Sequence, residues 1–232
     1  MALEQIDGAA DNPFPFDIAT AAPARLRRIF RSGAYRGTTA NMANGYTQGN
    51  LAILPASHAL DFARFCQRNP KPCPMVGVSD TGDPMIRTLG EDIDIRSDIP
   101  SYNIYRDGVL EGSRADIKEY WRDDSVAFVL GCSFSFEEAL SQGGIPLRHM
   151  EIERTVPMYK TSIELVRSGP FGGGMVVSMR PMSMEEAIRA SVITARFPHT
   201  HGMPVHIGDP SAIGIGDLDA PDWGEPTEFR GA

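Results

Sequence analysis

The feature that most constrains this chain is a strand-to-helix turn near its middle. Residues 125–130 read SVAFVL, a nearly continuous apolar run typical of a strand covered on both faces. Residues 131–137 read GCSFSFE and lead into the helix-forming segment EEALSQ, which two glycines follow. Such a turn presents backbone N–H groups at a helix N-terminus, where an anion or a developing oxyanion is stabilised.

Four side chains of this turn are therefore candidates for catalysis. They are Cys132, Ser133, Ser135 and Glu137. The alternative interpretation is that Ser135 only caps the following helix, with Glu138 completing a Ser-x-x-Glu capping box.

Composition limits the class of function. The net charge of −8 argues against a nucleic-acid-binding surface. Cys66 and Cys73 lie seven residues apart, wider than the usual zinc pair, so they are interpreted as reduced thiols. The N-terminus lacks a basic region followed by an apolar run, and no stretch approaches the ~20 apolar residues of a membrane span. We therefore expect a cytoplasmic protein that contacts neither nucleic acid nor membrane.

The periodicity predicts helices and strands in mixed order. The expected helices cover 23–32, 57–68 and 113–121, with a further helix capped by Ser183 and Glu186 that turns Ile188, Val192 and Ala195 inward. The expected strands cover 75–80 and 172–179, with a hairpin at 101–112 that turns at Asp107-Gly108.

This order predicts an α/β fold, with a mixed sheet and helices on its faces. We expect residues 1–100 and 170–232 to form the main domain and residues 101–169 a smaller, inserted α+β sub-domain.

Arginines recur where one element ends and another begins. They are Arg68, Arg96, Arg148 and Arg180. A guanidinium binds a carboxylate through two parallel hydrogen bonds, so these positions suit a small acidic substrate. The alternative is pairing with the thirty acidic residues of the chain. Gln48 and Asn50, at the end of a segment (33–50) rich in Gly, Asn and Thr, are further substrate-binding candidates.

A histidine-rich loop follows the last predicted helix. It carries His199, His201, His206 and Asp209. Imidazole with carboxylate could bind a metal, but the spacing matches no known ligand set, so we predict no metal. Acid–base chemistry by His201 and His206, oriented by Asp209, and a purely structural loop remain the alternatives.

Asp92 and Asp94 alternate with isoleucines, which predicts two carboxylates on one face of a strand. They could serve acid–base work or bind a cation, or the strand could be a half-exposed edge.

The chain has no phosphate-binding Gly-x-x-x-x-Gly-Lys loop, no Gly-x-Gly-x-x-Gly after a strand and no Gly-x-Ser-x-Gly elbow. These absences argue against ATP, dinucleotide and serine-hydrolase functions.

Several long blocks of the chain resemble one family. They are QGNLAILP, DFARFCQRNPKPCP, GEDIDIRSDIPSYNIYRDG, FVLGCSFSFEEAL, RHMEIERTVPMYKTSI, VVSMRPM and HGMPVHIGDPSAIGI. Together they are similar to the YcsI-like hydro-lyases, also called the D-glutamate cyclase family, over roughly residues 20–220. The resemblance implies a cytoplasmic lyase without a cofactor, an α/β fold with a larger and a smaller sub-domain, and cyclisation of D-glutamate to 5-oxo-D-proline with loss of water.

Lactam formation requires that the α-carboxylate is held, that the γ-carboxyl is protonated and that the ammonium loses a proton. We assign the α-carboxylate to Arg96 or Arg180, the γ-oxygens to the turn at 132–135, and acid–base work to Glu137, His201 or His206.

Two other functions stay open. The family pattern continues past residues 217–222 (DLDAPD) into a block resembling FWACGVTPQ, which this chain lacks. A non-catalytic small-acid binding protein that keeps the pocket is therefore an alternative, as is a hydro-lyase for a different small acid. Self-association into a homo-oligomer is also left open.

Overall fold

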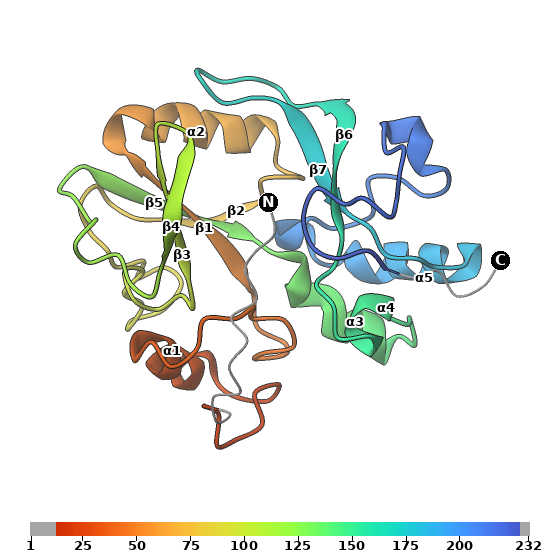
Figure 1. Cartoon of the computed structure of the whole chain (residues 1–232), viewed down its shortest axis with the longest axis horizontal. Helices are drawn as coiled ribbons and strands as arrows, with labels where there is room; N and C mark the ends of the chain where they lie inside the picture. Colours follow the sequence, from red (N-terminus) through yellow and green to blue (C-terminus); the bar gives the residue numbers. More distant parts are fainter. Residues whose placement is uncertain (1–12, 228–232) are drawn as a thin grey trace. The chain divides into compact units, whose positions relative to one another are not determined.

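The computed structural model describes residues 13–227, which form two compact units. The N-terminal unit contains residues 13–59 and 76–135, and the C-terminal unit contains residues 60–75 and 136–227. These boundaries differ from the predicted ones at residues 100 and 170. Helices and strands mix within the chain, as expected for the α/β class (Figure 1).

The N-terminal unit is built on a three-stranded sheet of order β1-β5-β2. The strands are β1 (Gly49–Pro55), β2 (Met75–Val78) and β5 (Ser125–Gly131), and β1 pairs with β5 in antiparallel fashion. The predicted apolar strand is β5, whose first four residues are buried. Alternate side chains of β1 and β5 pack with Ile86 and Ile95 into one core cluster. Burial of these faces fixes the register, since a one-residue slip would expose them.

The predicted hairpin is also present. Strands β3 (Tyr102–Arg106) and β4 (Val109–Arg114) turn at Asp107 and Gly108, which both have positive φ. The predicted helix at 113–121 is wrong. β4 extends through Arg114, and Ser113 Oγ donates to Asn103 Oδ1 across the hairpin (2.6 Å) instead of capping a helix.

Helix α1 (Pro23–Arg31) belongs to the same unit. It has Pro in its first turn, as predicted, and its buried Leu26 and Phe30 pack with Phe14 and Met42. Helix α2 (Ala56–Arg68) begins in this unit and continues into the C-terminal unit.

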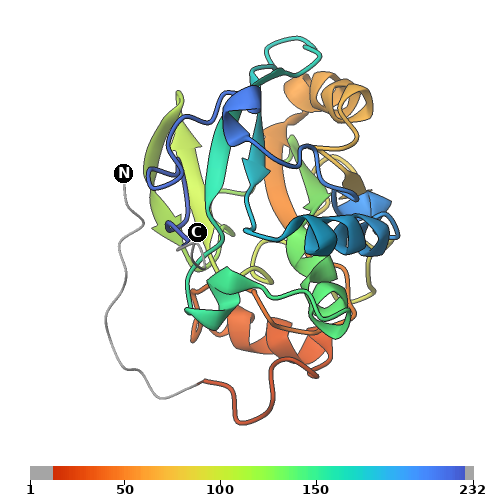
Figure 2. The ribbon, with the colours of Figure 1, turned by 90° about the vertical axis from the view of Figure 1, so that its right-hand side faces the viewer.

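The C-terminal unit combines short helices with an antiparallel strand pair. Its elements are α3 (Glu137–Gln142), α4 (Arg148–Glu151), β6 (Met158–Glu164), β7 (Gly174–Ser178), α5 (Met184–Thr194) and the 3₁₀ turns η2 (Pro198–Thr200) and η3 (Pro210–Ile213). Helices α3 and α5 pack together, and Phe136, Leu140 and Ala190 belong to their shared core (Figures 1 and 2).

Helix α5 begins with the predicted capping box but buries a different face. Ser183 Oγ accepts from Glu186 N–H, and Glu186 Oε2 accepts from Ser183 N–H. Ile188 and Val192 are exposed, and so is Ala195. The buried positions are the small residues Ala187, Ala190 and Thr194. Small side chains on α5 let α3 approach it closely. A search for the most hydrophobic face of α5 therefore selects the wrong face.

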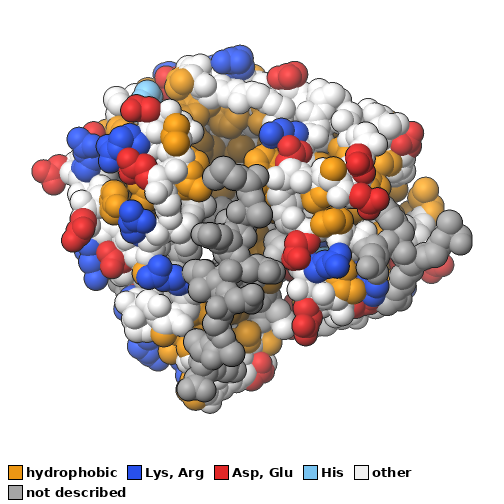
Figure 3. Space-filling view, viewed as in Figure 1, with side chains coloured by type: hydrophobic (Ala, Val, Ile, Leu, Met, Phe, Trp, Pro, Cys, Tyr) orange, Lys and Arg blue, Asp and Glu red, His pale blue; other side chains and the backbone are white. Residues whose placement is uncertain are grey.

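On the face drawn in Figure 3, Lys and Arg side chains lie among Asp and Glu side chains. Several ion pairs join such side chains in the described part of the chain, among them Arg106–Glu111 (2.6 Å). Within residues 13–227, no helix has the length and apolar character needed to cross a bilayer.

Candidate active site

The turn at 131–137 has the predicted strand-to-helix form. β5 ends at Gly131, the 3₁₀ turn η1 covers Ser133–Phe136, and α3 follows directly. The predicted capping box of Ser135 and Glu138 is wrong, because the N-cap of α3 is Phe136 and it makes no side-chain cap. The hydroxyl of Ser135 instead accepts from the backbone N–H of Gln48 (2.8 Å).

Backbone contacts connect this turn to the start of β1. Cys132 N–H donates to Gln48 O (2.9 Å), and Ser135 N–H donates to Cys132 O (3.1 Å). These two N–H groups are therefore already engaged in the fold. Cys132, Ser133 and Ser135 are half-buried.

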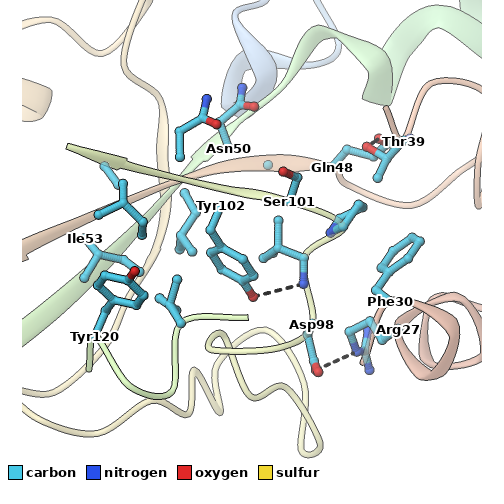
Figure 4. Close-up of a pocket in the computed structure, with 18 of the residues that line it drawn as sticks. Arg27, Phe30, Thr39, Gln48, Asn50, Ile53, Asp98, Ser101, Tyr102 and Tyr120 are labelled. Carbon is cyan, nitrogen blue, oxygen red and sulfur yellow. Dashed lines mark hydrogen bonds and ion pairs between the residues drawn. The ribbon is translucent and has the colours of Figure 1, made fainter. Parts of the chain in front are cut away.

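Beside the turn lies a cavity of about 1070 Å³ in the N-terminal unit (Figure 4). Gln48, Asn50 and Phe134 line it, so two predicted substrate-binding residues and one residue of the turn border the same cavity. Aromatic and hydroxyl side chains complete the lining, among them Phe30, Thr39, Ser101, Tyr102 and Tyr120. A largely uncharged wall with a few polar groups is typical of small-molecule sites.

Gln48 holds the loop over this cavity. Its Oε1 accepts from Thr39 Oγ1 (2.7 Å), and its Nε2 donates to Met42 O (2.9 Å). Asn50, the second residue of β1, is exposed and lines the cavity. Of the two amides, Asn50 is therefore better placed to bind a ligand.

The charged groups at the cavity edge pair with one another. The side chain of Asp98 is fully buried; it accepts from Arg31 Nη2 (2.6 Å), and Arg27 Nε lies 3.4 Å away. Tyr102 Oη donates to Ile95 O (2.7 Å) and accepts from Ile99 N–H (3.2 Å). Burial raises the pKa of the Tyr102 phenol above its ordinary value, so this hydroxyl stays neutral at physiological pH.

Arg96 pairs with a neighbour in sequence. Its Nε and Nη2 donate to the two carboxylate oxygens of Asp94 at 2.9 and 2.8 Å. The predicted strand with Asp92 and Asp94 on one face is wrong, because residues 91–98 form turns apart from a single bridge at Asp94. Asp92 pairs with Arg27 at 2.5 Å. A bidentate partner already occupies Arg96, which leaves Arg180 as the stronger candidate for a substrate carboxylate.

Glu137 and Arg180 meet in the C-terminal unit. Arg180 Nη2 donates to Glu137 Oε1 (2.5 Å), and His149 Nε2 lies 3.0 Å from the same oxygen. The exposed fractions of the three side chains are 4% for Glu137, 4% for His149 and 10% for Arg180. Arg180 also lies over the ring of Phe136, 5.6 Å from its centroid. This buried carboxylate, imidazole and guanidinium form what we call the Glu137 cluster.

The Glu137 cluster keeps its carboxylate ionised. Burial raises the pKa of Glu137, whereas the hydrogen bond with His149 and the charge of Arg180 lower it. Together the two lowering effects outweigh burial, so the pKa of Glu137 falls below its ordinary value. An ionised carboxylate of low pKa is a weak base and holds no proton to donate at neutral pH. Glu137 is therefore better suited to position Arg180 and His149 than to act as a catalytic acid.

His201 lies in the C-terminal unit and packs against the turn that follows α2. Its Nδ1 lies 3.0 Å from Lys71 O, and its φ is +80°, unusual for a non-glycine residue. A carbonyl oxygen only accepts, so Nδ1 carries the hydrogen and Nε2 is the basic nitrogen of the neutral ring.

His206 has the opposite tautomer. Its Nε2 donates to the backbone O of Asp209 (2.7 Å), so Nδ1 is the basic nitrogen of the neutral ring. Asp209 thus orients a histidine through its carbonyl, whereas its carboxylate accepts from the N–H and hydroxyl of Ser211. These two hydrogen bonds hold the pKa of Asp209 below its ordinary value.

The remaining candidates are distributed over both units. Arg148 opens α4 and lies 3.4 Å from Glu151. Within residues 13–227, no three His, Cys, Asp or Glu side chains gather as metal ligands would. The roles assigned from the sequence require the turn at 131–137, Arg96, Arg180 and the histidine loop to line one cleft. This convergence stays a prediction, because some of the candidates lie in one unit and some in the other: Cys132, Ser133, Ser135, Arg96, Gln48 and Asn50 belong to the N-terminal unit and the rest to the C-terminal unit.

Sequence reasoning missed His149. It follows Arg148 directly, and the one sequence signal for its burial is that the apolar residues Leu147 and Met150 lie beside it. Histidines in apolar segments are common, so this signal alone would not have singled it out.

Known proteins resemble this chain along most of its length. The profile of the D-glutamate cyclase family matches residues 126–232. A protein named "Putative hydro-lyase" from Bordetella petrii is 57% identical over 211 residues, which cover 91% of this chain and 79% of the relative. Another of that name from Jannaschia sp. is 59% identical over 212 residues, covering 91% of this chain and 80% of the relative.

A third such protein, from Azorhizobium caulinodans, is 57% identical over 215 residues, covering 93% of this chain and 79% of the relative. The matched region contains the turn, the Glu137 cluster and the histidine loop. At this identity and coverage, the chain belongs to the family of these hydro-lyase-named relatives, and its residues 126–232 carry the D-glutamate cyclase pattern.

Proposed function

We propose that this protein is a hydro-lyase for a small acidic amino acid, and that it cyclises D-glutamate to 5-oxo-D-proline. The D-glutamate cyclase pattern of residues 126–232 supports the reaction class. The observation that carries the proposal at the level of residues is the fixed guanidinium of Arg180, held by Glu137 at 2.5 Å and stacked on Phe136.

A pre-positioned guanidinium suits recognition of a carboxylate. Holding Arg180 between an ion pair and an aromatic ring removes much of the conformational entropy that binding would otherwise have to overcome. Arg180 is the most exposed member of the Glu137 cluster, so it is the member that we propose contacts the α-carboxylate of the substrate. Glu137 and His149 are positioning residues behind it.

His206 is the proposed acid–base group. In the reaction, the amino nitrogen attacks the γ-carboxyl carbon, a C–N bond forms, and one C–O bond breaks to release water. The nitrogen must lose two protons in all, and the departing carboxylate oxygen must gain two to leave as water. Nδ1 of His206 can accept each proton from the nitrogen in turn, and the resulting imidazolium can donate it to the departing oxygen.

The test is turnover of pure enantiomers. D-Glutamate, L-glutamate and D-aspartate would be incubated with the protein, and 5-oxoproline would be quantified by chiral chromatography. We expect 5-oxo-D-proline from D-glutamate only. Binding of D-glutamate without turnover would favour a non-catalytic small-acid binding protein, and turnover of another acid alone would favour a different hydro-lyase.

Replacing Arg180 with lysine is expected to weaken D-glutamate binding by about ten- to a hundredfold, because an ammonium cannot reproduce a two-pronged contact. Isothermal titration with D-glutamate measures this change. Arg189→Lys is the matched control, since Arg189 is exposed on α5 and donates to the backbone oxygen Gly144 O. Equal affinities for the two variants would remove Arg180 from the substrate site.

A further inference from the structure

The turn after α2 brings two thiols together. Cys66 lies in the last turn of α2, and Cys73 follows in the proline-rich segment NPKPCP (69–74). The two side chains are hydrogen-bonded to each other. Neither forms a disulfide in the structure.

The backbone holds the two cysteines in this arrangement. Asn69 N–H donates to Phe65 O (3.0 Å) and Cys66 O (3.1 Å), and Asn69 O accepts from Cys73 N–H (3.0 Å). The Asn69 side chain, itself buried, donates to Val166 O (2.9 Å) and accepts from Val166 N–H (2.9 Å). The chain thus folds back over the end of α2, and the fixed φ of the flanking prolines restricts it further.

We propose that Cys66 and Cys73 form an oxidation site, at which a hydroperoxide converts the two thiols into an intramolecular disulfide. The Cys73 sulfur attacks the peroxide oxygen, the O–O bond breaks, and a sulfenic acid and one water or alcohol form. The Cys66 sulfur then attacks the sulfenic sulfur and releases water. The two sulfurs lose two electrons in total, and the hydroperoxide gains them.

The two thiols differ in the way that these two reaction steps require. Cys66 is 2% exposed, whereas Cys73 is half-buried, so Cys73 is the more accessible residue of the two. The hydrogen bond from Cys66 lowers the pKa of Cys73, while the same bond and burial raise the pKa of Cys66. An accessible, more acidic thiol beside a buried second thiol is the arrangement of a sensing and a resolving cysteine.

The site is connected to the histidine loop through Lys71. Lys71 Nζ donates to His201 O (3.0 Å) and to Met203 O, and Lys71 O accepts from His201 Nδ1. Lys71 lies two residues before Cys73, so shortening the thiol contact to a covalent bond changes the turn that carries it. Oxidation is therefore expected to loosen the contacts that hold residues 201–203.

The first measurement uses the wild-type chain. After exposure to hydrogen peroxide and alkylation of the remaining thiols, peptide mass spectrometry should find a Cys66–Cys73 crosslink and leave Cys132 alkylated. In Cys66→Ala, a sulfenic acid on Cys73 should persist and react with dimedone, whereas Cys132→Ser should form the crosslink as the wild type does. Oxidation of Cys132 alone, or the absence of a Cys66–Cys73 crosslink with excess peroxide, would overturn the proposal. The result for the wild-type chain tests the proposal even if a variant fails to fold.

Hydrogen exchange tests the connection to the loop. Oxidised protein should exchange amides of residues 199–203 several-fold faster than reduced protein, and reduced Lys71→Met should show the same change. If exchange there is unaltered in the crosslinked protein, the crosslink and the loop are not coupled. Neither measurement depends on turnover, so a failure of the oxidation proposal can be distinguished from a failure of the proposed reaction.

Discussion

Replacing Glu137 with alanine is expected to lower the free energy of unfolding by about 3–5 kcal/mol, the loss typical of removing one partner from a buried ion pair. The variant leaves the guanidinium of Arg180 buried without the carboxylate that it contacts at 2.5 Å, and it removes the partner of His149. Chemical denaturation of both proteins measures the difference. Glu138→Ala, on the same turn of α3 but with an exposed hydrogen bond to Gln142, should change stability by about 0.5 kcal/mol or less.

A second substitution separates the charge from the packing. Glu137→Ala combined with Arg180→Met removes both charged partners, so much of the lost stability should return. Strictly additive losses in the two single variants would mean that Glu137 and Arg180 do not act as a pair.

The Glu137 cluster also predicts an acid limit to stability. The pKa of Glu137 is lower in the folded protein than its ordinary value of 4.5. Its stabilising contribution is therefore complete above the pKa of the unfolded chain and is lost as the pH falls through the lower, folded-state pKa. Unfolding measured from pH 7 downward should show a steeper loss of stability below about pH 4.5 in the wild type than in Glu137→Gln.

Replacing His206 with alanine is expected to reduce kcat for D-glutamate by about 10²–10⁴-fold while leaving KM nearly unchanged, as for a group that acts in the transition state. This expectation rests on the proposed reaction. The hydrogen bond from Nε2 to Asp209 O fixes the tautomer in which Nδ1 is basic. Steady-state kinetics on the folded protein provides the measurement.

His199→Ala is the matched control for His206. His199 is exposed in η2 at the start of the same loop and should leave kcat within about twofold of the wild type, as expected for a surface position. Added imidazole should restore part of the activity of His206→Ala if the lost function is proton transfer. Unchanged kcat in His206→Ala, with normal folding, would assign the acid–base role to another group.

Local signals in the sequence predicted several elements correctly. The Asp107-Gly108 turn, the apolar strand β5 and the capping box of α5 each depend on residues that are close in sequence. Their conformations follow from backbone preferences and short-range hydrogen bonds, which act regardless of the rest of the fold. The same signals failed where a local preference competed with pairing, as at Ser113, where the β3–β4 ladder replaced the expected helix.

By itself, the sequence determined the α/β class, most element positions, the strand-to-helix turn and, through its resemblance, the family. It also named Glu137 and Arg180 as candidates, but their contact joins residues 43 positions apart, and their partner His149 was not recognised. Only the tertiary structure decided which arginine pairs with which carboxylate, which face of α5 is buried, and which nitrogen of His201 and His206 is basic. These features depend on burial and on contacts between segments that are distant in the chain. The free energy of an ion pair or of a histidine tautomer is set by this local environment rather than by residue type.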